Sequence, residues 1–172
     1  MKKIISLFFV VIFAICACAC TSRGVPRKTE YDGKVILKIE TLWQEGFAAF
    51  PCDYVRTFDF EHGKVTDTWK ADEEYLDASN RRQYNCPKKI ATFSEEQGQA
   101  LVDKIGGLGF FDWEERYITE DEIVDAGAHC VNVYFADGTK KSTLIYFLSP
   151  PNYVKISEAI EDAFGVTMFL QQ

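Results

Sequence analysis

The sequence predicts an α+β fold in which an antiparallel β-sheet, made of two hairpins plus extra strands, carries two helices on one face. Short runs rich in β-branched and aromatic residues are joined by turns that contain Gly, and two other segments space their apolar residues as helices do. The order along the chain is strands, helix, strands, helix. The chain has 172 residues, of which 47% are hydrophobic, and a chain of this size can form one globular domain with a substantial core.

The first strands are predicted at residues 35–40, 54–60 and 65–69. Residues 61–64, with the sequence Glu-His-Gly-Lys, join the second and third of these runs, and Gly63 supplies the positive φ that such a turn needs. These two runs therefore form a hairpin. A short strand at residues 90–93 follows a long polar stretch.

The first helix has a strong start signal in Ser94 and Gln97. In this capping box the Ser94 hydroxyl accepts a hydrogen bond from the amide of Gln97, and the Gln97 side chain reaches back to the Ser94 amide. Gly106 and Gly107 predict a left-handed end to the helix. The apolar residues at helical spacing are Leu101, Ile105 and Leu108. The aromatic residues expected to pack on the sheet after it are Phe110, Phe111 and Trp113.

The second half repeats this order of elements. Residues 130–135 and 141–148 form a second hairpin around the Ala-Asp-Gly-Thr turn at 136–139. Residues 150–152, Pro-Pro-Asn, then open a helix that Gly165 closes. Its apolar stripe consists of Tyr153, Ile156, Ile160 and Phe164.

Residues 1–20 are predicted to be a bacterial lipoprotein signal rather than part of the fold. Two lysines precede an apolar run too short for a comfortable membrane span, and three cysteines follow within five residues. Cys18 is the best lipidation site because Ile15 stands three residues before it and Ala17 stands directly before it; Cys20 is the alternative. Two acyl chains on that thiol anchor a protein stably. An ordinary secretory signal that happens to contain cysteines is the competing interpretation.

The mature chain is therefore predicted to be exported and lipid-anchored to the cell membrane or outer membrane, facing the periplasm or the cell surface. Polar residues 21–34 form a tether and residues 35–172 a single domain. The whole chain has a formal net charge of -7; without Lys2 and Lys3, residues 21–172 carry 17 basic and 26 acidic groups, a net charge of -9. Such an acidic balance argues against nucleic acid as a partner.

Three cysteines remain in the mature domain, namely Cys52, Cys86 and Cys130. Disulfides can form outside the cytoplasm, and Cys52 and Cys86 each adjoin a proline at the margin of a predicted strand. We expect a bridge between these two, which would stabilise the domain by roughly 3 to 4 kcal/mol. The alternative is that all three are reduced small hydrophobic residues.

Catalytic and metal-binding patterns are weak in this sequence. His129 and Cys130 are adjacent in a predicted strand and would point to opposite faces, so they cannot form a dyad. Two histidines and no Cys-x-x-Cys in the mature domain argue against zinc. The acidic stretch from Asp112 to Asp125 lacks the Gly and Glu positions of a calcium loop. We expect no metal, no cofactor and no catalytic residue that can be named.

Aromatic residues near loops and strand ends form the candidate recognition surface. Its members are Trp69, Tyr75, Tyr84, Trp113 and Tyr117, with Trp43 in a similar position. Core packing is the alternative for each Trp taken singly. The leading hypothesis is a non-enzymatic binding or interaction module for an unknown protein or glycan. The second is an envelope inhibitor or immunity-type protein that blocks an enzyme with residues 70–89. A hydrolase built from carboxylates is the third.

Five segments of the chain carry a resemblance to other sequences, namely ICACAC, KVTDTW, FFDWEERY, VNVYFADGTK and SPPNYVKISEAI. In these segments the chain resembles a loose set of small bacterial lipoproteins, found especially in gut anaerobes, that has no assigned activity. The resemblance covers most of the mature domain and implies no catalytic residue.

Overall fold

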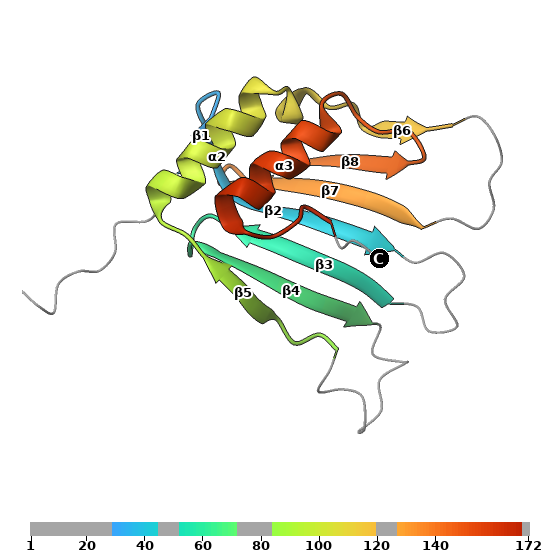
Figure 1. Ribbon diagram of the computed structural model, residues 1–172, viewed down its shortest axis with the longest axis horizontal. Helices are drawn as coiled ribbons and strands as arrows, with labels where there is room; N and C mark the ends of the chain where they lie inside the picture. Colours follow the sequence, from blue (N-terminus) through green and yellow to red (C-terminus); the bar gives the residue numbers. More distant parts are fainter. Residues whose placement is uncertain (1–28, 45–51, 72–83, 120–126, 170–172) are drawn as a thin grey trace, which may run out of the picture.

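A computed structural model describes residues 29–44, 52–71, 84–119 and 127–169. They form an α+β fold in which an eight-stranded, mostly antiparallel sheet carries two helices on one face (Figure 1), as the sequence predicts. Seven strands follow the order β5-β4-β3-β2-β7-β8-β6, and β1 pairs with β2 outside this path. None of the helices in the described part of the chain is long and apolar enough to span a membrane.

The first five strands are β1 (Thr29–Tyr31), β2 (Lys34–Gln44), β3 (Cys52–Asp59), β4 (Lys64–Ala71) and β5 (Lys88–Thr92). Gly63 has φ 59° in the turn between β3 and β4, which confirms the first predicted hairpin. The predicted tether is wrong in its second half, because residues 29–31 pair with β2 and Thr29 is 1% exposed.

The first helix, α2 (Glu95–Gly107), begins with the predicted capping box between Ser94 and Gln97. Its predicted end is too early: Leu108 caps the helix and the left-handed residue is Gly109, with φ 82°. Gly106 serves a different purpose, because the ring of Tyr31 packs where its Cβ would lie. A short 3-10 helix, η2 (Phe110–Asp112), follows.

The second half contains β6 (Arg116–Ile118), β7 (Ala128–Phe135), β8 (Lys140–Tyr146) and α3 (Tyr153–Phe164). Gly138 and Gly165 adopt left-handed φ angles of 82° and 68° at the predicted hairpin turn and helix end. The three-residue β6, which the sequence pattern does not reveal, lies parallel to β8.

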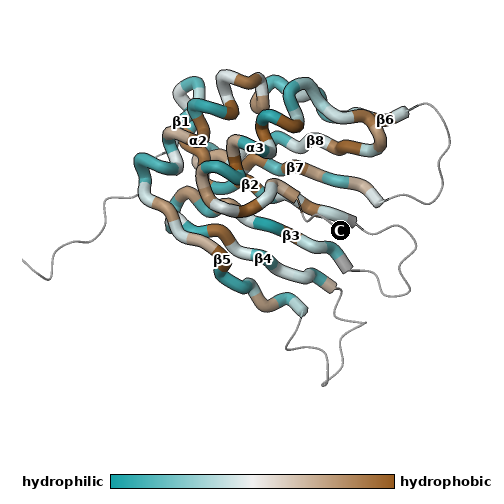
Figure 2. Tube along the Cα trace, in the orientation of Figure 1, coloured by the Kyte–Doolittle hydropathy of each residue, from teal (hydrophilic) through white to brown (hydrophobic). Residues whose placement is uncertain are grey.

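The core lies between the helices and the sheet, where Figure 2 shows hydrophobic residues in both layers. Phe164 of α3 stacks on Phe93 with ring centroids 4.3 Å apart and on Phe58 of β3 at 6.0 Å. The predicted packing of Phe110, Phe111 and Trp113 is confirmed, since they are 2%, 7% and 3% exposed. The other core positions include Ile39, Val65, Val133, Leu101, Val102, Ile105, Ile156 and Ile160.

Candidate functional site

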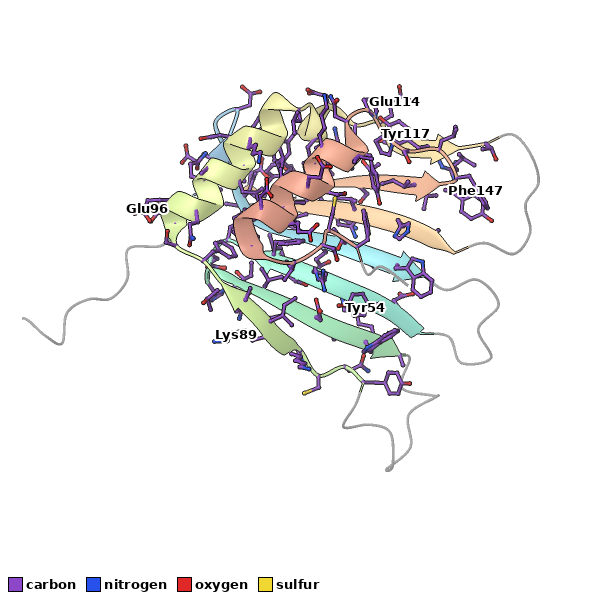
Figure 3. The ribbon with its side chains drawn as sticks, in the orientation of Figure 1. Tyr54, Lys89, Glu96, Glu114, Tyr117 and Phe147 are labelled. Carbon is purple, nitrogen blue, oxygen red and sulfur yellow. The ribbon has the colours of Figure 1, made fainter. Side chains whose placement is uncertain are left out.

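A row of four aromatic side chains crosses the sheet on its helix-bearing face. The strand register sets Trp69 opposite Tyr54, Tyr54 opposite Trp43, and Trp43 opposite His129, on β4, β3, β2 and β7. Figure 3 shows Tyr54 on the part of β3 that extends beyond the helices. We call these four residues the aromatic row.

The aromatic row combines a fixed base with accessible rings. Tyr54 is 5% exposed and meets Trp69 edge-to-face at a centroid distance of 5.0 Å. Trp69 is 37% exposed, and Trp43 and His129 are half-buried. Large rings that keep accessible surface offer apolar contact area at little cost in conformational entropy, as recognition surfaces require.

Arg56 lies two residues after Tyr54 on the same face of β3 and holds the aromatic row in place. Its guanidinium donates two hydrogen bonds to the Asp67 carboxylate at 2.8 and 2.9 Å and a third to the Tyr54 hydroxyl at 3.1 Å. Burial, with help from Asp67, raises the pKa of Tyr54 to about 12, so the phenol stays neutral. Such a bidentate pair is geometrically specific and restricts movement of the ring beside it.

The segment after α3 borders the aromatic row. Arg56 donates to the carbonyl oxygen of Thr167, and the Thr41 hydroxyl donates to that of Met168 at 2.7 Å. Phe169 then packs on the ring of His129, with centroids 4.4 Å apart. Strand side chains therefore hold residues 167–169 across the sheet.

A groove of about 440 Å³ runs between α3 and this segment. His129 contributes to its lining together with Ser157, Glu158 and Glu161. The His129 Nδ1 atom is buried and has no hydrogen-bond partner among the described residues, and burial lowers the pKa of the imidazole, which favours its neutral form. The groove has the volume of a small-molecule site, and it opens beside one end of the aromatic row.

The opposite face of the sheet carries a polar network centred on Glu40. Lys38 donates to one carboxylate oxygen at 2.7 Å and the Tyr134 hydroxyl donates to the other at 2.8 Å. Burial alone would raise the pKa of Glu40, but these hydrogen bonds and the charge of Lys38 outweigh it, and the pKa lies below its usual value. The Glu40 carboxylate is therefore ionised, and each of its two oxygens accepts a hydrogen bond.

Cys130 lies on this opposite face, and its thiol contacts the Asn132 side chain at 3.7 Å. His129 is on the helix-bearing face, so the prediction that the two cannot form a dyad is confirmed. Burial raises the pKa of the Cys130 thiol, which disfavours the nucleophilic thiolate.

The residues predicted to form a recognition surface do not all lie together. Trp69 lies in the aromatic row and is exposed. Tyr84 is half-buried, and the next residue, Asn85, donates its amide to the Trp69 carbonyl at 2.6 Å, so Tyr84 lies near the same strand end. Tyr75 lies outside the described residues.

Two of the predicted surface aromatics belong elsewhere. The prediction that Trp113 belongs to the recognition surface is wrong, because its side chain is 3% exposed and its indole donates to the Pro151 carbonyl at 3.1 Å. Tyr117 of β6 is half-buried against the core, and its hydroxyl accepts a hydrogen bond from the amide of Glu114 at 3.0 Å. Both rings stabilise the second half of the fold.

The cysteine predictions have different outcomes. Cys86 is a free, exposed thiol, so the predicted bridge to Cys52 is not formed in the structure. Moreover, strand β3 begins at Cys52, and β4 lies between β3 and the segment that contains Cys86. The Cys52 side chain is not among the described ones. The lipidation candidates Cys18 and Cys20 lie outside the described residues, as does most of residues 70–89.

Residues 29–44, 52–71, 84–119 and 127–169 contain no cluster of three or more His, Cys, Asp or Glu side chains that could hold a metal ion. Part of the acidic stretch from Asp112 to Asp125 lies outside these ranges.

The sequence pattern did not point to Tyr54 and Arg56. The sequence pattern that could have identified them is the alternation of residues in β3. Tyr54, Arg56 and Phe58 share one face, so a charged residue occupies an otherwise apolar face. A buried Arg in that position requires a partner from another strand.

Comparisons of the chain with protein-family models, with curated proteins and with solved structures gave no significant match.

Proposed function

We propose that this protein is a lipid-anchored, non-enzymatic binding domain of the bacterial cell envelope that recognises a partner protein through the aromatic row. The observation that carries the proposal is the cross-strand row of Trp69, Tyr54, Trp43 and His129 on the helix-bearing face of the sheet. Trp and Tyr dominate the energetics of protein interfaces.

The geometry around the row supports recognition by a surface that is already formed. Tyr54 is fixed by Arg56, and Trp69 packs against Tyr54. Little side-chain entropy is lost when such rings bind, so more of the contact energy appears as affinity.

A protein partner is favoured because a second segment of the chain, which includes Asn85, is fixed beside Trp69. The Asn85 side chain accepts a hydrogen bond from the Ala71 amide at 3.1 Å and donates to the Ala71 carbonyl at 2.8 Å. With the bond from the Asn85 amide to the Trp69 carbonyl, these contacts hold Asn85 against the end of β4, directly beside Trp69. A ring surface bordered by this second backbone segment offers an area wider than a small ligand needs.

The position of Asn85 also supports the second candidate, an inhibitor or immunity-type protein, because Asn85 belongs to residues 70–89. In that case the partner is an enzyme, and residues 70–89 contribute to the contact. The chemical identity of the partner separates the two candidates, since only the inhibitor would abolish a measurable activity of its partner.

Site-specific photo-crosslinking in intact cells tests the proposal. A photoreactive phenylalanine analogue in place of Trp69 should give one discrete protein adduct. The same analogue in place of Asp162, whose side chain is 73% exposed on α3, should give none. Trp69→Ala should weaken recovery of that partner by about tenfold or more, and Trp69→Phe should restore part of it.

Equal crosslinking from both positions would contradict the proposal, as would no adduct from position 69. A heterogeneous adduct that collapses after treatment with a glycan-cleaving enzyme would assign a glycan in place of a protein.

A further inference from the structure

The sheet face turned away from the helices is basic, although the protein as a whole is acidic. We call it the open face and define it by the strand positions that share a face with Leu42 in the register. Its basic residues are Lys38, Lys64, Lys70, Lys89, Arg116 and Lys140. Its acidic residues are Glu40, Asp53 and Asp59, with Glu30 on β1 at its border.

The central acids of the open face are largely withdrawn from solvent. The Glu40 side chain is 10% exposed and pairs with Lys38, and the Asp59 side chain is 18% exposed and lies 3.5 Å from Lys64. In contrast, Lys70, Lys140 and Arg116 are exposed. The accessible charge of this face is therefore more positive than its composition alone suggests.

The helix layer has the opposite charge. Together α2 and α3 carry six acidic residues and two lysines, Lys104 and Lys155. The connection after α2 adds the exposed side chains of Asp112, Glu114 and Glu115. The domain is thus polarised across its thickness, acidic on the helix side and basic on the open face.

Exposed apolar side chains adjoin the open face where β6 and β8 end. Ile118, Phe147 and Leu148 are 38%, 49% and 47% exposed. The Phe147 ring lies 4.6 Å from that of Tyr146, which pairs with Ile118 on the open face. Phe147 also has φ 67°, a left-handed conformation that costs a non-Gly residue energy, at the strand end shown in Figure 3.

We propose that the open face docks on the anionic phospholipid headgroups of the bilayer that holds the protein's N-terminal lipid. The docking rests on the lipid anchor of the proposed function. Lysines spread over several strands, with exposed apolar residues at one edge, match a headgroup surface, where basic residues meet anionic lipid and apolar side chains enter the interface. An acidic protein partner would use the same charges, but the N-terminal lipid keeps this face close to the headgroups, which favours the bilayer.

The short chain between the lipidated cysteine and the first strand makes a weak attraction of the open face to the headgroups effective. Cys18 and Thr29 are 11 residues apart, so the first strand can lie at most about 40 Å from the lipid. Confinement at this distance replaces a bimolecular encounter with an intramolecular one at high effective concentration. Docking also turns the helix layer and the aromatic row away from the membrane, where a partner can reach them.

The test uses the lipidated protein in vesicles of phosphatidylcholine, with or without about one-third phosphatidylglycerol. A water-soluble acetylating reagent labels accessible lysines, which are quantified by mass spectrometry. In anionic vesicles, Lys70 and Lys140 should be acetylated about threefold or more slowly than in neutral vesicles, and Lys104 and Lys155 should not change. High salt should remove the protection, since it screens the headgroup charge.

A double variant, Lys70→Gln with Lys140→Gln, should abolish the protection of Lys64, because each lysine near an anionic surface contributes a factor of about five to association. The matched control, Lys104→Gln with Lys155→Gln, should leave that protection intact. Both variants remove two exposed lysines, from opposite faces of the domain.

The outcomes separate the docking from the anchor. Protein that floats with both kinds of vesicle and is acetylated equally on both faces would overturn the docking and leave the anchor standing. Protein that floats only with anionic vesicles would refute the anchor and support the basic face. Protein that floats with neither would overturn both.

Discussion

Gly106 is the position where the packing of the first strand against α2 can be tested most sharply. An added Cβ would lie 2.2 Å from Cε2 and 2.7 Å from Cδ2 of the Tyr31 ring. That ring cannot withdraw freely, because it stacks on Phe111 with centroids 4.1 Å apart. Gly106→Ala must therefore displace either β1 or the helix.

The magnitude follows from two opposing effects. Overpacking costs about 1 to 3 kcal/mol, while Ala in place of Gly stabilises a helix by up to about 1 kcal/mol. We expect Gly106→Ala to lower the free energy of unfolding by about 1 to 2 kcal/mol. Gly107→Ala is the matched control, because a Cβ added there would meet no other atom within 4 Å, and the substitution should be neutral or slightly stabilising.

Urea unfolding and thermal melting of the two purified variants measure the difference. For a domain of this size, 1 kcal/mol corresponds to about 2 to 4 °C in Tm, so the variants should differ by about 2 to 8 °C. In a Tyr31→Ala background the penalty of Gly106→Ala should vanish. Equal stability of the two Gly variants would refute the packing and return residues 29–31 to the tether.

Two further predictions concern titratable groups. Because the pKa of Glu40 is lowered in the folded state, its contribution to stability is present above its unfolded pKa and is lost as the pH falls through the folded value. Glu40→Gln should therefore cost about 1 to 2 kcal/mol in urea unfolding at pH 7 and progressively less as the pH is lowered. Exposed Glu158→Gln should cost little throughout this range. Exposed Cys86 should react with a thiol reagent at pH 8 about tenfold faster than Cys130, whose pKa is raised by burial. Mass spectrometry of the labelled peptides measures the two rates. An unreactive Cys86 would support the disulfide with Cys52 instead.

The parts of the fold that the sequence predicts are those fixed by neighbours in the chain. Ser94 and Gln97 act within one helical turn, and Gly63, Gly138 and Gly165 adopt left-handed conformations at local turns and helix ends. Each of these signals depends on a few consecutive residues, so the sequence reveals it without knowledge of the sheet.

The parts that it does not predict depend on partners far away in the chain. Residues 29–31 contain no strand pattern of their own, and they are ordered by β2 and by the contact of Tyr31 with α2. The three residues of β6 gain their place from a parallel pairing with β8. Strands this short have no period that can be read from the sequence.

The aromatic row was partly within reach of the sequence. Trp69 and Trp43 lie near strand ends, and the hairpin register alone sets Trp69 opposite Tyr54. The other half of the row requires the pairing of β2 with β7, strands separated by more than 80 residues in the chain. Trp113 shows the converse, since its position near a loop suggests a recognition role, whereas the ring packs in the core, as expected for the residues that follow the first helix, and its indole bonds to Pro151.

The open face explains how a sheet with helices on one side remains stable on the other. Lys38 and Lys140 both lie over the Tyr134 ring, at 4.2 and 5.4 Å from its centroid, and Tyr134 donates to Glu40. Cross-strand pairs of this kind stabilise a sheet without burying it under another layer. The polar network therefore makes a covering partner unnecessary for folding, and docking of the open face on a membrane can be reversible. A face that needed burial to fold would bind permanently, whereas this one can bind and release with ionic strength and lipid charge.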